Sequence, residues 1–259
     1  MHLTDYSPLT TYPQPPSMQT TLCFDFGNTR LKCAVFEDKE YREERVLENT
    51  DQATIQQLID QYKPDKSILS SVINHSEEME LLLAKHTRFH KLGHTSRLPF
   101  TTPVGKPETI GADRLAICAA SVDLFPGKHN LAIGLGTCIT YNYINSSHEF
   151  LGGSISPGMN MRFRAMHEQT ALLPLIKAES NFPLVGFDTK TNLLSGVILG
   201  MAKEIDGIIE AYALKYSNFN VLLTGGDMGF FVPHLKNKIF ADPNLIYKGL
   251  YAISEYNNR

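Results

Sequence analysis

The sequence is poor in cysteine, and its four cysteines form no C-x-x-C pair. They are Cys23, Cys33, Cys118 and Cys138. Three of them lie inside apolar runs, where cysteine acts as a small hydrophobic residue rather than as a metal ligand. This spacing argues against a disulfide scaffold and favours a reducing compartment.

Long apolar runs and targeting signals are also missing. No apolar stretch is long enough to cross a bilayer, and the N-terminus has no basic region followed by an apolar one. Residues 1–19 are rich in proline and show no periodicity, so we expect a mobile leader, and Met18 could be the natural start. We therefore expect a cytoplasmic protein without a membrane partner.

Positive charge is neither abundant nor clustered. The formal net charge is −3 and the isoelectric point is near 6.3. A nucleic-acid-binding surface would need lysines and arginines massed along a stripe, and the sequence has none. We expect small-molecule partners and no nucleic acid. At 259 residues the chain has room for one large domain or two of moderate size.

Several familiar catalytic motifs are absent. Gly105-Lys106 is followed by proline and lacks the preceding glycine of a phosphate-binding P-loop. Gly134-Leu135-Gly136 has Ile139 where a dinucleotide fingerprint has its third glycine. His167-Glu168 lacks the second histidine of a zinc helix, and no G-x-S-x-G elbow occurs. The sequence thus disfavours all four of these site types.

What the sequence does contain is a polar, glycine-rich tip between two apolar runs. Leu22 to Val35 predicts a β-hairpin with the tip Gly27-Asn28-Thr29. Backbone amides at such a tip, followed by the charge of Lys32, suit a phosphate, and Asp25 could hold Mg²⁺ through water. Asp-x-Gly-Asn is also ordinary hairpin chemistry, so this tip by itself leaves both interpretations open.

The same pattern occurs a second time. Leu131 to Ile144 is again an apolar run, a Gly136-Thr137 tip and a second run of β-type residues. Gly27 and Gly136 take the same place in the two units. Two copies of a hairpin-led unit predict a duplicated domain.

The first hairpin is followed by alternating strands and helices. Ser70-Ser71 ends one of these strands, where parallel sheets place ligand-facing turns. We expect strands at 41–47 and 67–69, a helix at 51–62, and a helix from a cap at Asn74 or Ser76 to about Lys85.

The second hairpin is followed by a glycine-rich segment and a long helix. Gly152 to Gly158 predicts a flexible turn that feeds a helix from Met159 to about Leu172. The long helix ends near Leu214, and its apolar stripe from Leu194 to Ile209 suits a core face or a dimer contact.

The last third of the chain ends on another glycine pair. A short strand at 220–223 leads into Thr224-Gly225-Gly226-Asp227, and residues 247–253 suit a closing helix. Paired glycines at a strand end admit a flat ring or a phosphate, although a tight turn needs the same residues.

Between the two units, Gly111-Ala112-Asp113-Arg114 precedes a predicted helix from Leu115 to Phe125. A carboxylate at a helix start is stabilised by the helix dipole, which would explain Asp113 without any chemistry. An Asp-Arg pair directly after glycine also suits a catalytic base beside an anion clamp. The sequence alone leaves both explanations open.

The order of these motifs resembles a known family. Duplicated hairpin-led units with glycine-rich tips are similar to the actin, sugar kinase and Hsp70 superfamily, which binds ATP between its two halves. From Thr20 onward the series more specifically resembles type III pantothenate kinase. The motifs are Asp25-x-Gly27-Asn28-Thr29-x-x-Lys32, Gly111-Ala112-Asp113-Arg114, Gly136-Thr137, Gly152-Gly153-x-Ile155-x-Pro157-Gly158, Gly186-x-x-Thr189 with Ser195-Gly196, and Thr224-Gly225-Gly226.

The resemblance implies an α/β fold of two actin-like (ribonuclease H-like) domains, residues 20–112 and 113–259, with a cleft between them. It implies an enzyme that uses ATP and Mg²⁺ to phosphorylate pantothenate to 4′-phosphopantothenate, the first step of coenzyme A biosynthesis. It also implies a homodimer and, in many members, a monovalent cation such as K⁺ or NH₄⁺.

Carried over residue by residue, the resemblance implies roles for the motifs. Asp113 is the general base and Asp25 helps to place Mg²⁺. The ATP-binding residues are Asp25, Phe26, Gly27, Asn28, Thr29, Arg30, Leu31, Lys32, Thr137, Gly225 and Gly226. The pantothenate-binding residues are Val104, Gly111, Ala112, Asp113, Arg114 and Thr189, the last contributed across the cleft or by a partner subunit.

Three positions depart from the family pattern. Gly134 stands where an Asp associated with the monovalent cation is usual, Asn142 replaces a second Asp, and Val104 replaces an aromatic residue that contacts pantothenate. Dependence on potassium is therefore in doubt. Two alternatives stay open beside the kinase: a non-catalytic, nucleotide-binding family member with a regulatory or accessory role, and a kinase with a changed acceptor.

Overall fold

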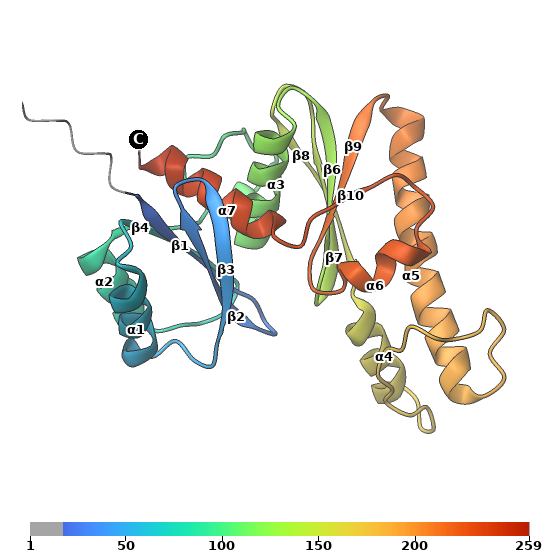
Figure 1. The fold of residues 1–259 in the computed structure, drawn as a ribbon. Helices are drawn as coiled ribbons and strands as arrows, with labels where there is room; N and C mark the ends of the chain where they lie inside the picture. The colour runs from blue at the N-terminus through green and yellow to red at the C-terminus, as the bar shows by residue number, and fades with distance from the viewer. Residues whose placement is uncertain (1–17, 259) are drawn as a thin grey trace, which may run out of the picture.

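The computed structural model describes residues 18–258, so the predicted leader at 1–19 lies almost wholly outside the described residues. The described chain forms two five-stranded sheets with helices between and around them (Figure 1). The fold is α/β, as the sequence predicts.

The first sheet is built from the N-terminal part of the chain. Its elements are β1 (Thr20–Phe26), β2 (Leu31–Glu37), β3 (Glu40–Leu47), α1 (Gln52–Tyr62), β4 (Lys66–Ser71), α2 (Glu77–His86) and β5 (Arg88–Lys91). The strand order is β3-β2-β1-β4-β5, with the first three strands antiparallel and the last two joined in parallel. Phe24 and Phe26 pack with α1 and α2, whereas Cys23 packs on the opposite face. Asp25 therefore shares the face of Cys23.

The second sheet repeats this plan. Its elements are β6 (His129–Leu135), β7 (Cys138–Ile144), β8 (Phe150–Pro157), α4 (Met159–Glu168), α5 (Thr189–Lys215), β9 (Phe219–Thr224), α6 (Met228–Phe231) and β10 (Phe240–Ala241). The strand order is β10-β9-β6-β7-β8, again with three antiparallel strands and two joined in parallel. The two sheets are topological copies, which confirms the predicted duplication.

Two helices lie between the sheets, α3 (Ala112–Leu124) and α7 (Leu245–Asn257) (Figure 1). α3 follows the first sheet but packs on β6 and β7, and α7 follows the second sheet but packs on β1 and β4. Where they cross, a Cβ atom on Gly249 would lie 1.8 Å from the carbonyl oxygen of Ala116, so only glycine allows this approach. The two halves are joined by this exchange of helices.

The prediction of a flexible turn at Gly152 to Gly158 is wrong, because most of this segment is strand β8. Gly153 pairs with Asn142 of β7, and a Cβ atom there would lie 1.8 Å from the Tyr141 carbonyl oxygen. The glycines therefore mark a close approach of two strands rather than a loop. The helix that follows is α4, which ends at Glu168 and not at the predicted Leu172.

The apolar stripe of α5 is core. Its residues pack against the second sheet, and Leu194, Ile198 and Ile205 are at most 1% exposed. The stripe is therefore not available for a dimer contact. The other predicted elements are confirmed with small shifts at their ends: Ser76 caps α2, and α3 begins at Ala112 rather than Leu115.

Candidate active site

The candidate site begins on the face of the first sheet that α3 and α7 cover. Asp25 is the last but one residue of β1 and pairs in register with Lys32 of β2. Asp113 lies in the first turn of α3, and its charge raises the pKa of Asp25, so the two carboxylates are neighbours. Residues predicted from separate motifs thus meet at one place.

Burial is the main cause of the raised pKa values of these two carboxyl groups. It raises the pKa of Asp25 to about 7; the Asp113 charge adds to this increase and the Lys32 charge opposes it. Burial also raises the pKa of Asp113, although the backbone N–H and the charge of Arg114 oppose the shift. Ionising both carboxylates together is costly here unless a cation lies between them.

The surroundings of Asp25 fit a magnesium ion better than a closed metal centre. Within residues 18–258, no group of three or more His, Cys, Asp or Glu side chains could hold a metal ion. Mg²⁺ is usually bound by one or two carboxylates, with waters and substrate phosphates filling its other positions. Asp25, with the Asp113 carboxylate as its neighbour, suits such a site.

A spare hydroxyl lies beside Asp25. Ser70 of β4 is its register partner and is 1% exposed. Among the described residues, its Oγ is the buried side-chain polar atom that has no hydrogen-bond partner. A buried hydroxyl without a partner is unusual, so Ser70 has a donor to offer to a group held at Asp25.

The tips of the two hairpins meet. Thr29 Oγ1 lies 3.2 Å from Thr137 Oγ1, and each tip is closed by a backbone hydrogen bond, from Gly27 N to the Arg30 carbonyl and from Gly136 N to the Cys138 carbonyl. Asn28 is exposed at the first tip.

Not every residue of the first tip has its side chain free for a ligand. The side chains of Phe26 and Leu31 belong to the core beneath the hairpin, so these two residues have only backbone groups to offer.

The turn after β9 also belongs to the candidate site. Gly225 has φ +104°, and a Cβ atom there would lie 2.1 Å from the Leu135 carbonyl oxygen at the base of the second tip. Asp227 N donates to the same carbonyl oxygen at 3.2 Å. Burial raises the pKa of Asp227 while the Arg30 charge opposes it, so the Gly225-Gly226-Asp227 turn also lies near the first tip.

The start of α3 is shaped around Asp113. Gly111 is the N-cap residue, and a Cβ atom on it would lie 2.5 Å from Asp113 Oδ1, so the carboxylate is folded back over Gly111. The side chain of Ala112 is buried in the core. Glycine at 111 therefore makes room for the aspartate.

Arg114 turns toward the second sheet. Its Nε donates to Asn142 Oδ1 at 2.7 Å, and its guanidinium lies over the Phe150 ring at 5.5 Å. Asn142 is fully buried and its Nδ2 donates to the Ala132 carbonyl at 3.1 Å. The amide at 142 thus satisfies an arginine and a backbone carbonyl together, which a carboxylate would not, because it lacks the donor.

Gly134 and Val104 are the other two positions that depart from the family pattern, and both have close neighbours. A Cβ atom on Gly134 would lie 2.8 Å from Thr140 Oγ1 and 3.2 Å from Ile117 Cδ1, so a larger side chain there has little room. Val104 packs against the core near Gly152 of β8, on the Arg114 side of the site.

Thr189 is not brought to this group within one chain. It is the first residue of α5 and is exposed. α5 packs on the face of the second sheet that includes Leu131 and Ile133, whereas α3 packs with Ala132 of the opposite face (Figure 1). Within one chain, Thr189 and Asp113 therefore belong to helices on opposite faces of the second sheet.

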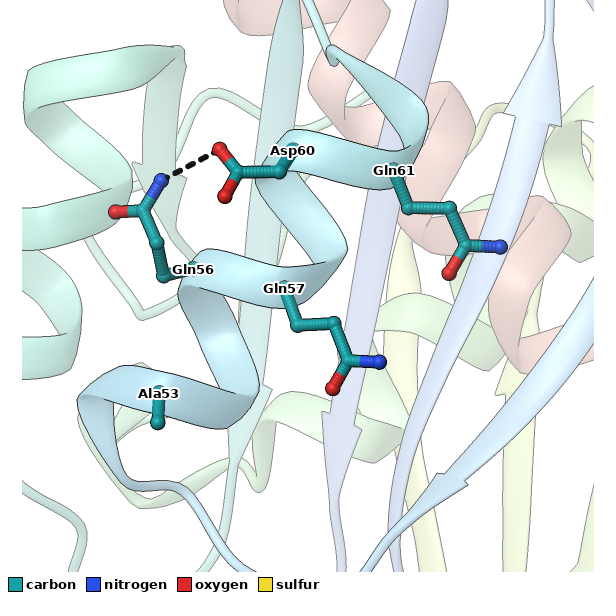
Figure 2. Close-up of a pocket in the computed structure, with 5 residues that line it drawn as sticks. All are labelled: Ala53, Gln56, Gln57, Asp60 and Gln61. Carbon is teal, nitrogen blue, oxygen red and sulfur yellow. Dashed lines mark hydrogen bonds between the residues drawn. The ribbon is translucent and has the colours of Figure 1, made fainter.

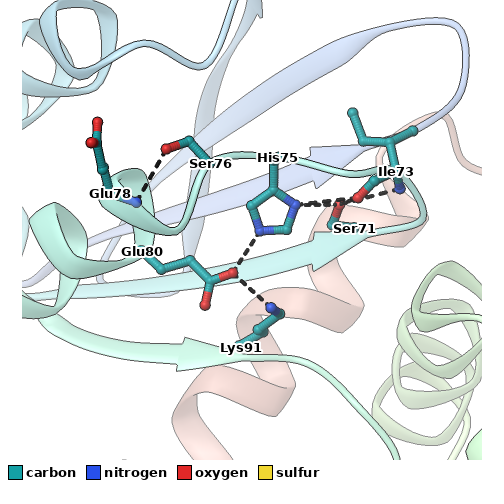
Figure 3. A network of polar contacts seen from close by, with 7 residues as sticks. All are labelled: Ser71, Ile73, His75, Ser76, Glu78, Glu80 and Lys91. Atoms are coloured by element: carbon teal, nitrogen blue, oxygen red, sulfur yellow. Dashed lines mark hydrogen bonds and ion pairs between the residues drawn. The ribbon is translucent and has the colours of Figure 1, made fainter.

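A second polar group braces the end of β4. Figure 3 shows the His75 ring between Ser71 Oγ, at 3.0 Å from Nδ1, and Glu80 Oε1, at 2.6 Å from Nε2. Lys91 Nζ donates to the same Glu80 oxygen at 2.6 Å. The ring packs edge-on against Phe26, 6.0 Å between centroids, so this network supports the first tip from behind.

The depression drawn in Figure 2 is not part of the site. Its lining residues all belong to α1: Ala53, Gln56, Gln57, Asp60 and Gln61. Gln56 Nε2 donates to Asp60 Oδ1 at 2.8 Å along the helix surface. One helix face offers no opposite wall to enclose a ligand.

Sequence reasoning missed two residues near Asp25: Glu44 and Tyr247. The charges of Glu44 and Asp25 raise the pKa of Tyr247, although burial is the larger cause. Strand alternation could have found Glu44, since it pairs with Ala34 and so shares the face of Lys32. No local signal marks Tyr247.

Comparisons with known proteins match this chain to one family. The family model described as type III pantothenate kinase matches residues 21–211. The type III pantothenate kinase of Christiangramia forsetii is 39% identical over 238 residues, which cover 91% of this chain and 98% of that protein. The one from Bacteroides fragilis strain YCH46 is 40% identical over 245 residues, 92% and 98% of the two chains.

A solved structure shows the same fold. The crystal structure of a conserved Baf family protein from Campylobacter jejuni matches with a TM-score of 0.58 and 22% identity, over 92% of this chain and 98% of that one. On the family model and the curated relatives together, this chain belongs to the type III pantothenate kinase family.

Proposed function

We propose that this chain transfers the γ-phosphoryl group of ATP to the primary hydroxyl of pantothenate, giving 4′-phosphopantothenate and ADP. This is the first step of coenzyme A biosynthesis. The observation that carries the proposal is the meeting of Asp25, Lys32 and Asp113, from β1, β2 and α3, in a chain 39–40% identical to kinases of this type.

The nucleotide would lie where the two hairpin tips meet. Backbone amides of the first tip other than that of Gly27, together with the Thr29 and Thr137 hydroxyls, would donate to phosphate oxygens, and Lys32 would supply a fixed positive charge. Gly225 and Gly226 leave the end of β9 open to a flat ring or a phosphate. When bound, Mg²⁺ would neutralise phosphate charge, and Asp25 is the residue we assign to hold it.

Asp113 is assigned as the general base. Its carboxylate would accept the proton of the pantothenate hydroxyl while that oxygen attacks the γ-phosphorus in line. Burial raises the pKa of Asp113, which makes the carboxylate a stronger base than an exposed one. Gly111, Arg114 and Val104 line the acceptor side of this carboxylate.

We infer a homodimer in which the partner subunit would bring Thr189 to the acceptor site, because α5 and α3 pack on opposite faces of the second sheet. Exposed apolar side chains gather just ahead of α5, where Leu184, Val185 and Phe187 are 78%, 80% and 81% exposed. Such exposure suits a surface that a second copy covers. Light scattering at micromolar concentration tests this inference, and a monomeric mass would contradict it.

We further infer a cytoplasmic location. All four cysteines are free, three of them are buried, and ATP is the co-substrate we assign. Within the described part of the chain, no helix combines the length and hydropathy of a membrane span.

The deciding experiment measures ADP release from purified protein with Mg²⁺ and ATP, with and without pantothenate. We expect pantothenate-dependent release that Asp113→Asn abolishes. Asp123→Asn, an exposed carboxylate on the same helix, is the matched control and should keep full activity. If the folded protein binds nucleotide but releases no ADP, the result would contradict kinase activity and favour a non-catalytic role. None of the observations above favours that role. Release with another hydroxyl compound alone would favour a changed acceptor.

A further inference from the structure

The ammonium of Lys32 is held by a residue outside the predicted motifs. Lys32 Nζ lies 3.0 Å from Glu44 Oε2, and the two side chains are 24% and 28% exposed. Glu44 belongs to β3 and pairs in register with Ala34 of β2, so it shares a sheet face with Lys32. The ion pair thus lies on the face that carries Asp25.

Glu44 is fixed in turn from the far end of the chain. Tyr247 OH donates to the same Oε2 atom at 2.7 Å. Tyr247 is 1% exposed and lies on α7, which packs on β1 and β4. Its ring stacks on Tyr41, 6.4 Å between centroids. A buried tyrosine in a fixed ring environment leaves Glu44 little freedom to move.

The charges around Glu44 keep it ionised. Although burial raises its pKa, hydrogen bonds from Tyr247 and Lys32 and the Lys32 and Arg30 charges lower it below the usual value. An ionised glutamate with two donors on one oxygen is a stable partner for a lysine.

We propose that Glu44, held by Tyr247, is a positioning residue that fixes the Lys32 ammonium beside Asp25 before the nucleotide binds. Lysine has a long, flexible side chain and binds phosphate as a point charge, so its entropy loss on binding is large unless a partner has already ordered it. This inference rests on the proposed role of Lys32 as the cation that meets the ATP phosphates.

The chain contains a matched control on the opposite face of the same strand. Glu43 accepts from Tyr62 OH at 2.8 Å and pairs with Arg45, Nε to Oε2 3.0 Å. Val35, the register partner of Glu43, belongs to the core under α1 and α2. Glu43→Gln and Tyr62→Phe therefore remove the same groups as Glu44→Gln and Tyr247→Phe, but away from Asp25.

The first test is kinetic. We expect Glu44→Gln and Tyr247→Phe to raise the KM for ATP by roughly three- to tenfold, the range that loss of one hydrogen bond or ion pair gives, with the KM for pantothenate unchanged. The KM for ATP of Glu44→Asp should lie between those of the wild type and Glu44→Gln. The two control variants should behave like the wild type. Equal effects of the Glu43 and Glu44 variants would overturn the proposal, because they would indicate general destabilisation.

The second test does not depend on activity. An amine-acetylating reagent followed by mass spectrometry measures how fast Lys32 is modified. Pairing with Glu44 slows this reaction, so Glu44→Gln should speed it several-fold and Glu43→Gln should not. Unchanged Lys32 labelling in Glu44→Gln would overturn the proposal even if the wild type releases no ADP. Absence of pantothenate-dependent ADP release in the wild type with the expected labelling would instead count against the proposed function.

Discussion

The hydroxyl oxygens of Thr29 and Thr137 lie 3.2 Å apart, so the tips of the two duplicated hairpins touch each other. Each threonine follows the glycine or asparagine of its own tip, and each tip closes on itself through a backbone hydrogen bond. Because we assign both tips to the ATP phosphates, at least one of these hydroxyls would exchange this contact for one with a phosphate oxygen when the nucleotide binds.

The threonine pair gives the first prediction. Thr29→Ala and Thr137→Ala should each raise the KM for ATP by roughly two- to tenfold, as expected for one lost hydrogen-bonding group. In the double variant, the KM for ATP should rise by less than the product of the two single increases, because the two residues share one contact. Steady-state kinetics of the four proteins measures this. Effects that multiply fully would show that the two hydroxyls act independently.

The raised pKa of Asp25 predicts how stability depends on pH. Its carboxyl has a pKa of about 7 in the folded protein, above the usual value near 4. Between these values the folded state keeps a proton that the unfolded state releases, so the free energy of unfolding falls as the pH rises from about 4 to about 7. Burial shifts Asp113 in the same direction.

Asp25→Asn removes this titration. In nucleotide-free and metal-free protein, its urea midpoint should exceed that of the wild type, and the gain should be larger at pH 8 than at pH 5. Asp123→Asn, exposed on α3, should show no such pH-dependent gain. If Asp25→Asn differs from the wild type equally at both pH values, Asp25 does not titrate as described.

The two glycines after β9 should differ in how well they tolerate a side chain. Gly225 has φ +104° and no room for a Cβ atom beside the Leu135 carbonyl, whereas nothing lies within 4 Å of a Cβ atom on Gly226. Gly225→Ala should therefore lower stability by about 1–3 kcal/mol, the usual cost of such strain, which corresponds to roughly 2–4 °C in Tm per kcal/mol. Thermal unfolding checks this. Gly226→Ala is the control, and an equal loss there would contradict the argument.

The surroundings of Gly134 predict how the enzyme responds to monovalent cations. With no carboxylate at 134, and with Thr140 Oγ1 and Ile117 filling the space beside it, we expect equal rates in potassium and sodium buffers at constant ionic strength. Gly134→Asp should lower the Tm without creating potassium dependence, because the new side chain meets packed atoms. A strong potassium requirement in the wild type would show that other ligands replace the carboxylate.

Local pattern determined much of this molecule. The hairpins follow from the alternation of apolar residues around glycine-rich tips, and the pairing of Asp25 with Lys32 follows from the hairpin itself. Adjacent antiparallel strands bring such residues together whatever the rest of the chain does. The same local reasoning failed at Gly152 to Gly158, because glycine loosens the backbone in a loop and also permits two strands to approach closely.

Only the tertiary structure decided which distant residues join the site. Asp113 approaches Asp25, and Tyr247 reaches Glu44, because α3 and α7 cross between the two sheets at Gly249 and Ala116. A helix's own sequence specifies which face is apolar but not which sheet that face will cover. The two hairpin tips, the place of Asp113 at a helix start and the glycine turn after β9 could therefore be predicted from the chain. The ion pair that holds Lys32 depends instead on packing between the two ends of the chain.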